Sequence, residues 1–217
     1  MVVSERRRNA FTLIATILGS TIVFLDATVV NVALPNLSDD LGAGLADQQW
    51  VVEAYLLALV SLLLVGGSLG DQFGRRRLFM IGLVGFGVTS ILCGLAPNTE
   101  VLIAGRALQG FAGALLVPGS LAILAATFEG EARGKAVGTW TAWSGIATVV
   151  GPAGGGLLVE AFSWRAIFWV NIPLIAVTLW VARDAVQESS DPQADRRIDW
   201  LGIAMSAAGL GGPVYAL

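Results

Sequence analysis

The sequence is divided into apolar runs of about 20 residues, and these runs limit the possible folds more than any other feature. A helix that spans a bilayer needs about 20 mostly apolar residues. Seven segments meet this requirement: 10–34, 50–70, 78–96, 101–126, 136–159, 166–181 and 200–217. Turn and cap residues such as Pro35-Asn36 and Pro97-Asn98 lie between them. The pattern predicts an all-α protein that crosses a lipid bilayer several times.

The composition supports this prediction and excludes other classes of protein. Hydrophobic residues make up 55% of the 217 residues and charged residues 13%, and the mean hydropathy is +0.74. A soluble fold usually carries about 25% charged residues, and a disordered chain is poor in apolar residues. With no His and a single Cys, the chain cannot build a zinc cluster or a Ser-His or Cys-His set. We therefore expect no metal site, no catalytic residues and no enzyme activity, and the 13 Lys and Arg indicate no nucleic-acid partner.

The longest polar stretch, residues 183–199, divides the chain. It predicts a six-helix bundle over residues 1–182, a cytoplasmic linker over 183–199 and a seventh transmembrane helix over 200–217. A signal peptide is an alternative for the first run, because Arg6-Arg7-Arg8 precedes it. That run is too long for the apolar region of a signal peptide and contains Asp26, so we expect a retained helix.

The positions of the basic residues predict the orientation. With a cytoplasmic N-terminus, eleven of the 13 basic residues lie in inner segments. These are Arg6, Arg7, Arg8, Arg75, Arg76, Arg77, Arg133, Lys135, Arg183, Arg196 and Arg197. Arg165 is in an outer segment and Arg106 is inside a span. The positive-inside rule therefore favours a multi-pass protein of the cytoplasmic membrane with its N-terminus inside.

Three ionisable residues, Asp26, Glu53 and Arg106, interrupt the apolar runs. Each costs about 2.5 to 3.5 kcal/mol at the bilayer centre on insertion scales, so such groups usually face one another or a water-filled cavity. At 1.5 Å per residue, Asp26 and Arg106 lie about 12 and 8 Å below the same outer face. We expect them to pair or to share a cavity. A purely structural ion pair is the alternative.

Proton coupling in a chain without His must use carboxylates, and Asp26 is the better candidate. Burial favours its neutral form whereas Arg106 favours its carboxylate, and movement of the arginine can switch this balance. Glu53 lies only about one turn inside its span, so its carboxylate could also reach the outer interface.

Small residues predict close helix packing in two spans. Without a hydrophobic drive between helices in lipid, such residues let backbones approach. In the fifth span we place Thr141, Ser144, Gly145, Thr148, Pro152 and Gly155 on one face, with a bend at Gly151-Pro152. In the fourth span Arg106, Gln109, Gly110 and Gly113 share a face. Cys93 is expected to be a small apolar residue in a helix.

Several ordered motifs together resemble the major facilitator superfamily, and within it the fourteen-helix drug:proton antiporter subfamily. The motifs are LDATVVNVALP at 25–35, GSLGDQFGRRR at 67–77, RALQG at 106–110, ATVVGPAGGG at 147–156, Trp164-Arg165 with Phe168, Asn171 and Pro173, and DWLG at 199–202. The match covers nearly the whole chain. Gln72 stands where the family often has Arg, and Ala147 stands where Gly is usual.

The resemblance implies a fold and a set of roles. The fold would be the N-terminal six-helix bundle of a major facilitator transporter, built from two inverted three-helix repeats, plus a seventh helix. Proton coupling and transport would involve Asp26, Arg106, Glu53, Asn31 and Gln109. The gating loop motif would involve Gly67, Gly70, Asp71, Gly74, Arg75 and Arg76, and the antiporter motif Gly145, Gly151, Pro152 and Gly155.

Within the gating loop we expect Gly67 and Gly70 to allow close approach, Gly74 to form a tight turn and Asp71 to hold Arg75 or cap a helix. The implied function is proton-coupled export of small hydrophobic or amphipathic molecules, driven by the proton motive force without a cofactor. The transporter would need a missing C-terminal half or a second copy as partner. Export of a specific metabolite or natural product, and a truncated fragment that does not transport, remain alternatives.

Overall fold

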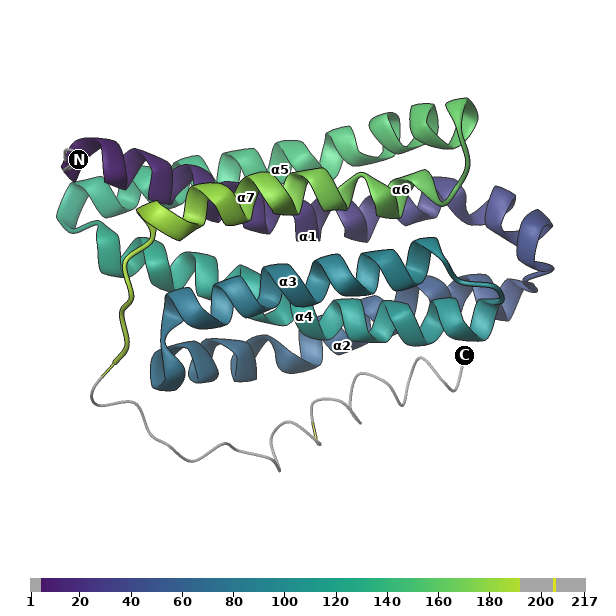
Figure 1. The fold of residues 1–217 in the computed structure, drawn as a ribbon, viewed down its shortest axis with the longest axis horizontal. Helices are drawn as coiled ribbons and strands as arrows, with labels where there is room; N and C mark the ends of the chain where they lie inside the picture. The colour runs from purple at the N-terminus through teal and green to yellow at the C-terminus, as the bar shows by residue number, and fades with distance from the viewer. Residues whose placement is uncertain (1–4, 192–204, 206–217) are drawn as a thin grey trace.

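The computed structural model describes residues 5–191 and Met205, and it is a bundle of helices without strands in that part of the chain (Figure 1). The helices are α1 (Glu5–Leu41), α2 (Leu45–Phe73), α3 (Arg75–Gly94), α4 (Thr99–Thr127), α5 (Gly130–Ala161), α6 (Ala166–Trp169) and α7 (Asn171–Ala185). With α6 and α7 taken as one, the described residues form six spans that are long and apolar enough to cross a membrane. The first six predicted spans are thus confirmed. The predicted seventh helix, 200–217, and residues 192–199 of the linker lie outside the described residues.

The helices extend beyond the apolar runs at both ends. α1 is 37 residues long and continues through Pro35, where the sequence predicted a break. That prediction is wrong because proline removes one backbone donor without having to end a helix. At 1.5 Å per residue α1 measures about 55 Å, whereas the hydrocarbon core of a bilayer is about 30 Å thick. Its polar ends therefore reach past the lipid.

The sixth span is divided at Val170 into α6 and α7. Pro173 explains the division, because it has no N–H to donate to the carbonyl of Trp169. Val170 keeps helical dihedrals and donates to the Ala166 carbonyl at 3.0 Å, so the chain continues in nearly the same direction. The predicted boundary at residue 182 falls one turn too early, because α7 ends at Ala185.

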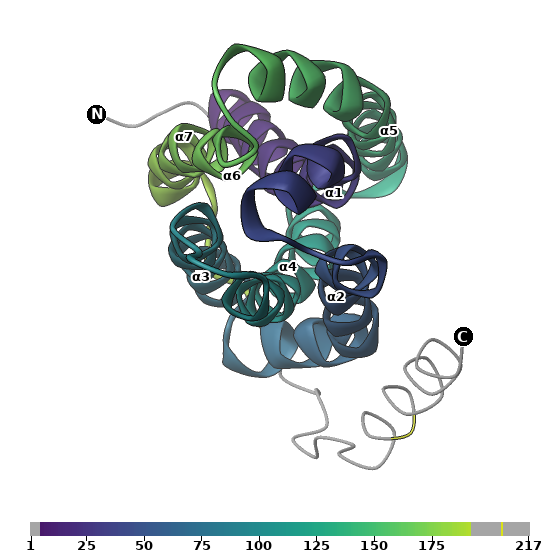
Figure 2. The same ribbon diagram turned by 90° about the vertical axis from the view of Figure 1, so that its right-hand side faces the viewer.

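Helices α1 and α4 occupy the middle of the bundle in the end-on view, and the other helices surround them (Figure 2). α4 packs closely against α2. A Cβ on Gly110 would lie 2.8 Å from the Cβ of Ala58, and one on Gly66 would overlap the carbonyl oxygen of Ala114. Arg106, Gln109, Gly110 and Gly113 are all buried, so the predicted face of α4 is confirmed. Small residues thus bring the α2 and α4 backbones together.

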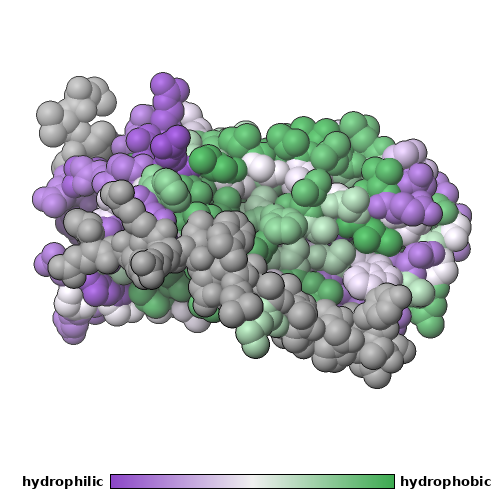
Figure 3. Space-filling view, turned by 90° about the horizontal axis from the view of Figure 1, so that it is seen from below, coloured by the Kyte–Doolittle hydropathy of each residue, from purple (hydrophilic) through white to green (hydrophobic). Residues whose placement is uncertain are grey.

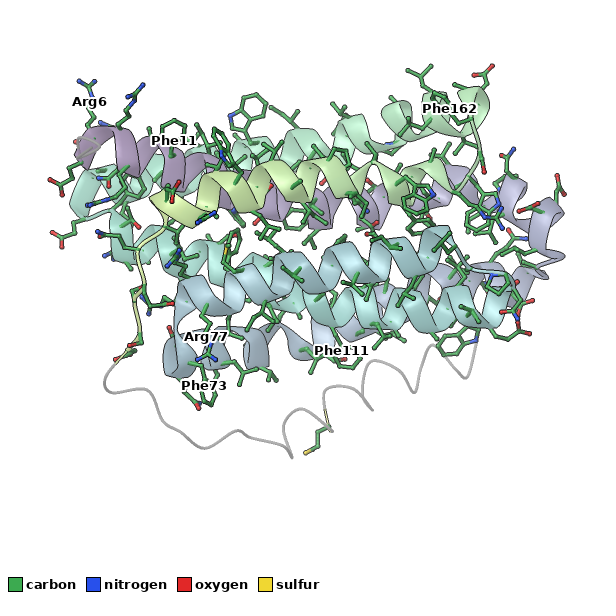
Figure 4. All side chains as sticks on the ribbon, in the orientation of Figure 1. Arg6, Phe11, Phe73, Arg77, Phe111 and Phe162 are labelled. Carbon is green, nitrogen blue, oxygen red and sulfur yellow. The ribbon has the colours of Figure 1, made fainter. Side chains whose placement is uncertain are left out.

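The surface has an apolar middle and polar ends, as a transmembrane bundle requires (Figure 3). Leu64 of α2 and Val149 of α5, both well inside their helices, are 84% and 77% exposed, consistent with contact to lipid. At one end lie the basic starts of α1, α3 and α5 (Figure 4 labels Arg6 and Arg77). At the other end Arg165 forms an ion pair with Asp40. The basic residues of the described chain are therefore concentrated at one end.

We predict that Gly110→Ala destabilises the bundle by about 1 to 3 kcal/mol, because even a methyl group overlaps α2. Gly138→Ala in α5 is the matched control, since nothing lies within 4 Å of its Cβ position. It should be neutral or slightly stabilising, because alanine favours the helix. Unfolding of both variants in detergent measures the difference, and equal stability would contradict the close contact.

Candidate functional site

A buried ion pair between Asp26 of α1 and Arg106 of α4 lies at the centre of the bundle. Both side chains are fully buried, at 0% exposure. An Arg106 NH1 hydrogen is donated to Asp26 Oδ2. The sequence-based prediction that these residues pair is confirmed, and the pair is enclosed by the helices of the bundle.

The second oxygen of the Asp26 carboxylate accepts hydrogen bonds from two side-chain amides. Gln109 Nε2 donates to Oδ1 at 3.2 Å, and Asn171 Nδ2 donates to it at 3.0 Å. Both amides also donate to Ser90 Oγ, at 2.8 and 3.2 Å. These residues form a polar cluster, Asp26, Ser90, Arg106, Gln109 and Asn171, to which α1, α3, α4 and α7 contribute.

The Arg106 guanidinium is held on several sides. Its Nε donates to the Val51 carbonyl at 3.1 Å, and NH1 donates to Gln109 Oε1 at 2.7 Å. The guanidinium carbon lies 4.1 Å from the centre of the Tyr55 ring, which is a favourable cation–π distance. Tyr55 is itself fixed, because its hydroxyl donates to the Val23 carbonyl at 2.9 Å. α2 therefore holds the arginine beside the carboxylate.

The polar cluster retains one donor and one acceptor without a partner in the described residues. These buried atoms are Arg106 NH2 and Asn171 Oδ1. Buried polar groups are usually satisfied, because an unpaired one loses its hydration without compensation. The cluster therefore has the capacity for further or different hydrogen bonds.

Three residues around the ion pair were not among the candidate site residues from the sequence. Ser90 and Tyr55 looked like ordinary members of apolar runs, and Asn171 was noted only within a motif. The position of Asn171 inside the apolar run 166–181 could have identified it, because a polar amide within a membrane span needs a hydrogen-bond partner. Cys93, expected to be only an apolar residue, lies with its sulfur 3.8 Å from Gln109 Oε1.

Glu53 and Asn31 lie apart from the polar cluster. The exposed Asn31 amide donates only to carbonyls of its own helix, Ala27 and Thr28. Glu53 is partly exposed and makes no hydrogen bond or ion pair within the described residues. The two residues line one open pocket of about 250 Å³ between α1 and α2. The structure thus brings them near each other but not to Asp26.

The loop between α2 and α3 has the tight turn and the ion pair that were predicted. Gly74 has a φ of 103°, which favours glycine, and Arg75 binds Asp71 through Nε at 2.8 Å and NH2 at 2.7 Å. The expectation for Gly67 and Gly70 is wrong, because a Cβ on either would meet only ordinary van der Waals contacts. The close approach belongs to Gly66.

The start of α3 is capped by a residue that follows α7. The Glu188 carboxylate accepts the backbone N–H groups of Arg76 and Arg77, both at 3.1 Å. The Arg75 N–H donates to the Ser189 carbonyl at 2.9 Å, and Arg76 NH2 donates to the Arg183 carbonyl at 2.6 Å. A carboxylate at this position satisfies free backbone donors and the helix dipole. The described part of the predicted linker is thus attached to the α2–α3 loop.

The glycine motif of α5 packs against α1, but on a different face from the predicted one. A Cβ on Gly151 would lie 2.6 Å from Thr28 Oγ1, and one on Gly155 would overlap the Val29 side chain. Gly145 is exposed with open space around it, so it is not part of this contact. The buried residues of α5 are Ala136, Trp140, Ser144, Ala147, Gly151, Gly155 and Val159.

The predicted face of α5 therefore needs correction. It combined Ser144 and Gly155, which are buried, with Thr141, Gly145 and Thr148, which are exposed. The prediction placed small residues on one face by their spacing, whereas the contact with α1 combines glycines with a large residue, since Trp140 Nε1 donates to Ser20 Oγ at 3.0 Å. Pro152 is half-buried, and α5 passes through it as one continuous helix.

Comparisons with known proteins all indicate the same family. The family model described as Major Facilitator Superfamily matches residues 16–214. Multidrug resistance protein Stp of Mycobacterium tuberculosis is 42% identical over 97% of this chain, and the puromycin resistance protein pur8 of Streptomyces alboniger is 41% identical over 96%. The tetracenomycin C resistance and export protein of Streptomyces glaucescens is 38% identical over 95%.

The chain spans only 38% to 42% of the length of these relatives. Solved structures show the same fold. A peptide transporter of the POT type, in complex with sulfate, matches 99% of this chain and 49% of its own length, with a TM-score of 0.73 and 14% identity. A bacterial homolog of the lysosomal transporter Spinster matches 96% of this chain with a TM-score of 0.68 and 18% identity.

We predict that Asn171→Leu destabilises the bundle by about 1 to 3 kcal/mol, because the Asp26 carboxylate loses a buried donor. Asn31→Leu is the matched control, since Asn31 is exposed and bonds only to its own helix. Its effect should stay within about 0.5 kcal/mol. Denaturant unfolding in detergent compares the two variants, and similar losses for both would contradict a special role of Asn171.

We also predict that Glu188→Ala loosens the first turn of α3, because two backbone donors lose their acceptor. The loss of such a cap costs about 1 kcal/mol. Amide hydrogen exchange of Arg76 and Arg77 should therefore accelerate several-fold. Glu131→Ala, an exposed acidic residue in the first turn of α5, is the control. Unchanged exchange at α3 in Glu188→Ala would argue against the cap.

Proposed function

We propose that this chain, which belongs to the Major Facilitator Superfamily, forms the N-terminal part of a proton-coupled exporter of small hydrophobic or amphipathic molecules. It is a multi-pass membrane protein, and we place its N-terminus in the cytoplasm because the basic ends of its helices favour that side. The proton motive force would drive transport without a cofactor. A C-terminal half or a second copy of the chain would complete the transporter, because such proteins alternate access between two helix bundles.

The buried pair of Asp26 and Arg106 carries this proposal. A buried ion pair adds little to stability compared with apolar residues, so its presence within a membrane span favours a functional role. The pair connects α1 to α4, the first helices of the two proposed three-helix repeats. Protonation of Asp26 would remove the attraction to Arg106 and so weaken the connection between these helices. Proton binding is thereby linked to helix movement.

The surroundings of the pair support such a switch. Arg106 would keep the Val51 carbonyl, Gln109 and the Tyr55 ring as partners after Asp26 became neutral. The free Arg106 NH2 and Asn171 Oδ1 leave hydrogen-bonding capacity for a second arrangement. Hydrogen bonds within the cluster can therefore rearrange while the Arg106 guanidinium keeps some of its partners.

The other candidate residues fit secondary roles in this proposal. Glu53 and Asn31 line a pocket that is open to the surface, where a carboxylate could exchange protons or attract a cationic substrate. The α2–α3 loop, with Asp71 and Arg75, would control access at the basic end. Gly151 and Gly155 would allow α5 to slide against α1. None of these residues is needed to hold the central ion pair.

Export of a specific natural product is the second candidate. The names of two relatives favour it: the tetracenomycin C resistance and export protein, and the probable actinorhodin transporter of Streptomyces coelicolor, which is 38% identical over 91% of this chain. The buried ion pair would serve either cargo. Competition by such compounds against dye efflux would distinguish a narrow substrate range from a broad one.

The test is efflux of a lipophilic cationic dye from energised, efflux-deficient bacteria. One arm produces the protein alone, and a second produces it together with the C-terminal half of the puromycin resistance relative. We predict proton-driven efflux in at least one arm and at least a tenfold slower rate for Asp26→Asn. Asp39→Asn, which removes an exposed carboxylate from the end of α1, should leave the rate unchanged.

Two results would contradict the proposal, provided that the variants reach the membrane in equal amounts. Equal efflux by the wild type and Asp26→Asn would exclude Asp26 from proton coupling. No efflux in either arm would favour the alternative of a fragment that does not transport.

A further inference from the structure

A cavity of about 450 Å³ opens between the start of α1 and the end of α7, outside the polar cluster. Arg7, Arg8 and Phe11 line it from α1, and Trp180 and Asp184 line it from α7. The cavity combines cationic side chains with aromatic ones. Its lining therefore suits a ligand that has both an anionic and an apolar part.

The charge of the cavity favours an anion. Arg7 makes no ion pair with the described residues. Arg8 makes only a long one, because its NH2 lies 4.0 Å from Oε1 of the exposed Glu5. Asp184 is the acidic residue in the lining, so two guanidinium groups face one carboxylate. Guanidinium groups bind phosphate well because their planar donors match its oxygens.

The aromatic residues lie toward the apolar middle of the bundle. Phe11 follows Arg7 by one helical turn, and Trp180 precedes Asp184 by one turn (Figure 4 shows Arg6 and Phe11 in succession along α1). Trp180 is 72% exposed and Phe11 is 38% exposed, and the next exposed residues toward the middle are Ile14 and Val177. Tryptophan is enriched where the headgroup layer meets the hydrocarbon. The groove therefore leads from basic residues to a lipid-facing apolar surface.

From this arrangement we infer that the cavity between α1 and α7 binds an anionic phospholipid such as phosphatidylglycerol. Arg7 and Arg8 bind the phosphate, and an acyl chain lies along Phe11, Ile14 and Trp180. Basic pockets between transmembrane helices on the cytoplasmic side are suited to such headgroups. Bound lipid would connect the first and last helices of the described bundle, which already pack against each other.

Binding is measured as the rise in the thermal unfolding midpoint of the detergent-purified protein when phosphatidylglycerol is added. Phosphatidylcholine with the same chains and inorganic phosphate are the comparison additions. The site variant is R7Q/R8Q, and the matched control is R133Q/K135Q, which removes two exposed basic residues from the start of α5 at the same end of the bundle. Losing two basic residues near an anionic headgroup should weaken binding about 30-fold. The control should change it less than twofold.

A second measurement needs no substitution. Phosphatidylglycerol with a photoreactive headgroup is crosslinked to the wild-type protein, and the labelled peptides are identified by mass spectrometry. We expect labels within residues 5–16 and 177–185. This keeps the inference testable if R7Q/R8Q does not fold, and neither measurement depends on transport.

Several results would overturn the inference. An equal rise with phosphatidylcholine would show that lipid in general stabilises the bundle. The same rise with inorganic phosphate alone would identify a free anion site. Equal weakening in both double variants would indicate diffuse attraction to the basic end, and crosslinks confined to other helices would place the lipid elsewhere.

Discussion

The cost of placing a charge inside a membrane governs the centre of this bundle. Asp26 and Arg106 each carry a desolvation cost that only close pairing can offset, and the structure surrounds the pair with further donors from Gln109 and Asn171. Besides α1, α3, α4 and α7, α2 contributes the Val51 carbonyl and the Tyr55 ring, and α6 contributes the Phe168 ring at 5.8 Å from the guanidinium carbon. The ion pair thus requires the helices around it to pack closely. Each must also be rotated so that its polar side chain points to the cluster.

Close contacts join the helices, and one of them positions Arg106. Gly110 lies one residue after Gln109 and brings α4 against α2, so that Arg106 reaches a carbonyl of α2. Gly151 and Gly155 bring α5 against the side of α1 near Thr28 and Val29. At the basic end, Glu188 connects the chain after α7 to the start of α3. The contact at Gly110 therefore supports the central charges, whereas the other two contacts hold α5 to α1 and the chain after α7 to α3.

The sequence was sufficient for the number of spans in the described part and for the Asp26–Arg106 pair, because the spans follow from apolar length and the pair from the depth of the two residues. It was insufficient where contacts between distant segments decide which residues of a helix are buried or capped. Whether Gly66 or Gly67 faces α4 depends on helix rotation, and Glu188 reaches α3 from 112 positions along the chain. The buried face of α5 was mispredicted for the same reason. Local signals there are weaker than the packing against neighbouring helices.

The most direct test of this account is a double-mutant cycle for unfolding of the protein in detergent, with Asp26→Leu and Arg106→Met. Each single variant leaves one buried charge without its partner and should lose about 3 to 5 kcal/mol of stability. The double variant removes both charges, so it should be more stable than either single variant. Losses that simply add in the double variant would contradict the claim that the two charges neutralise one another in the bundle core.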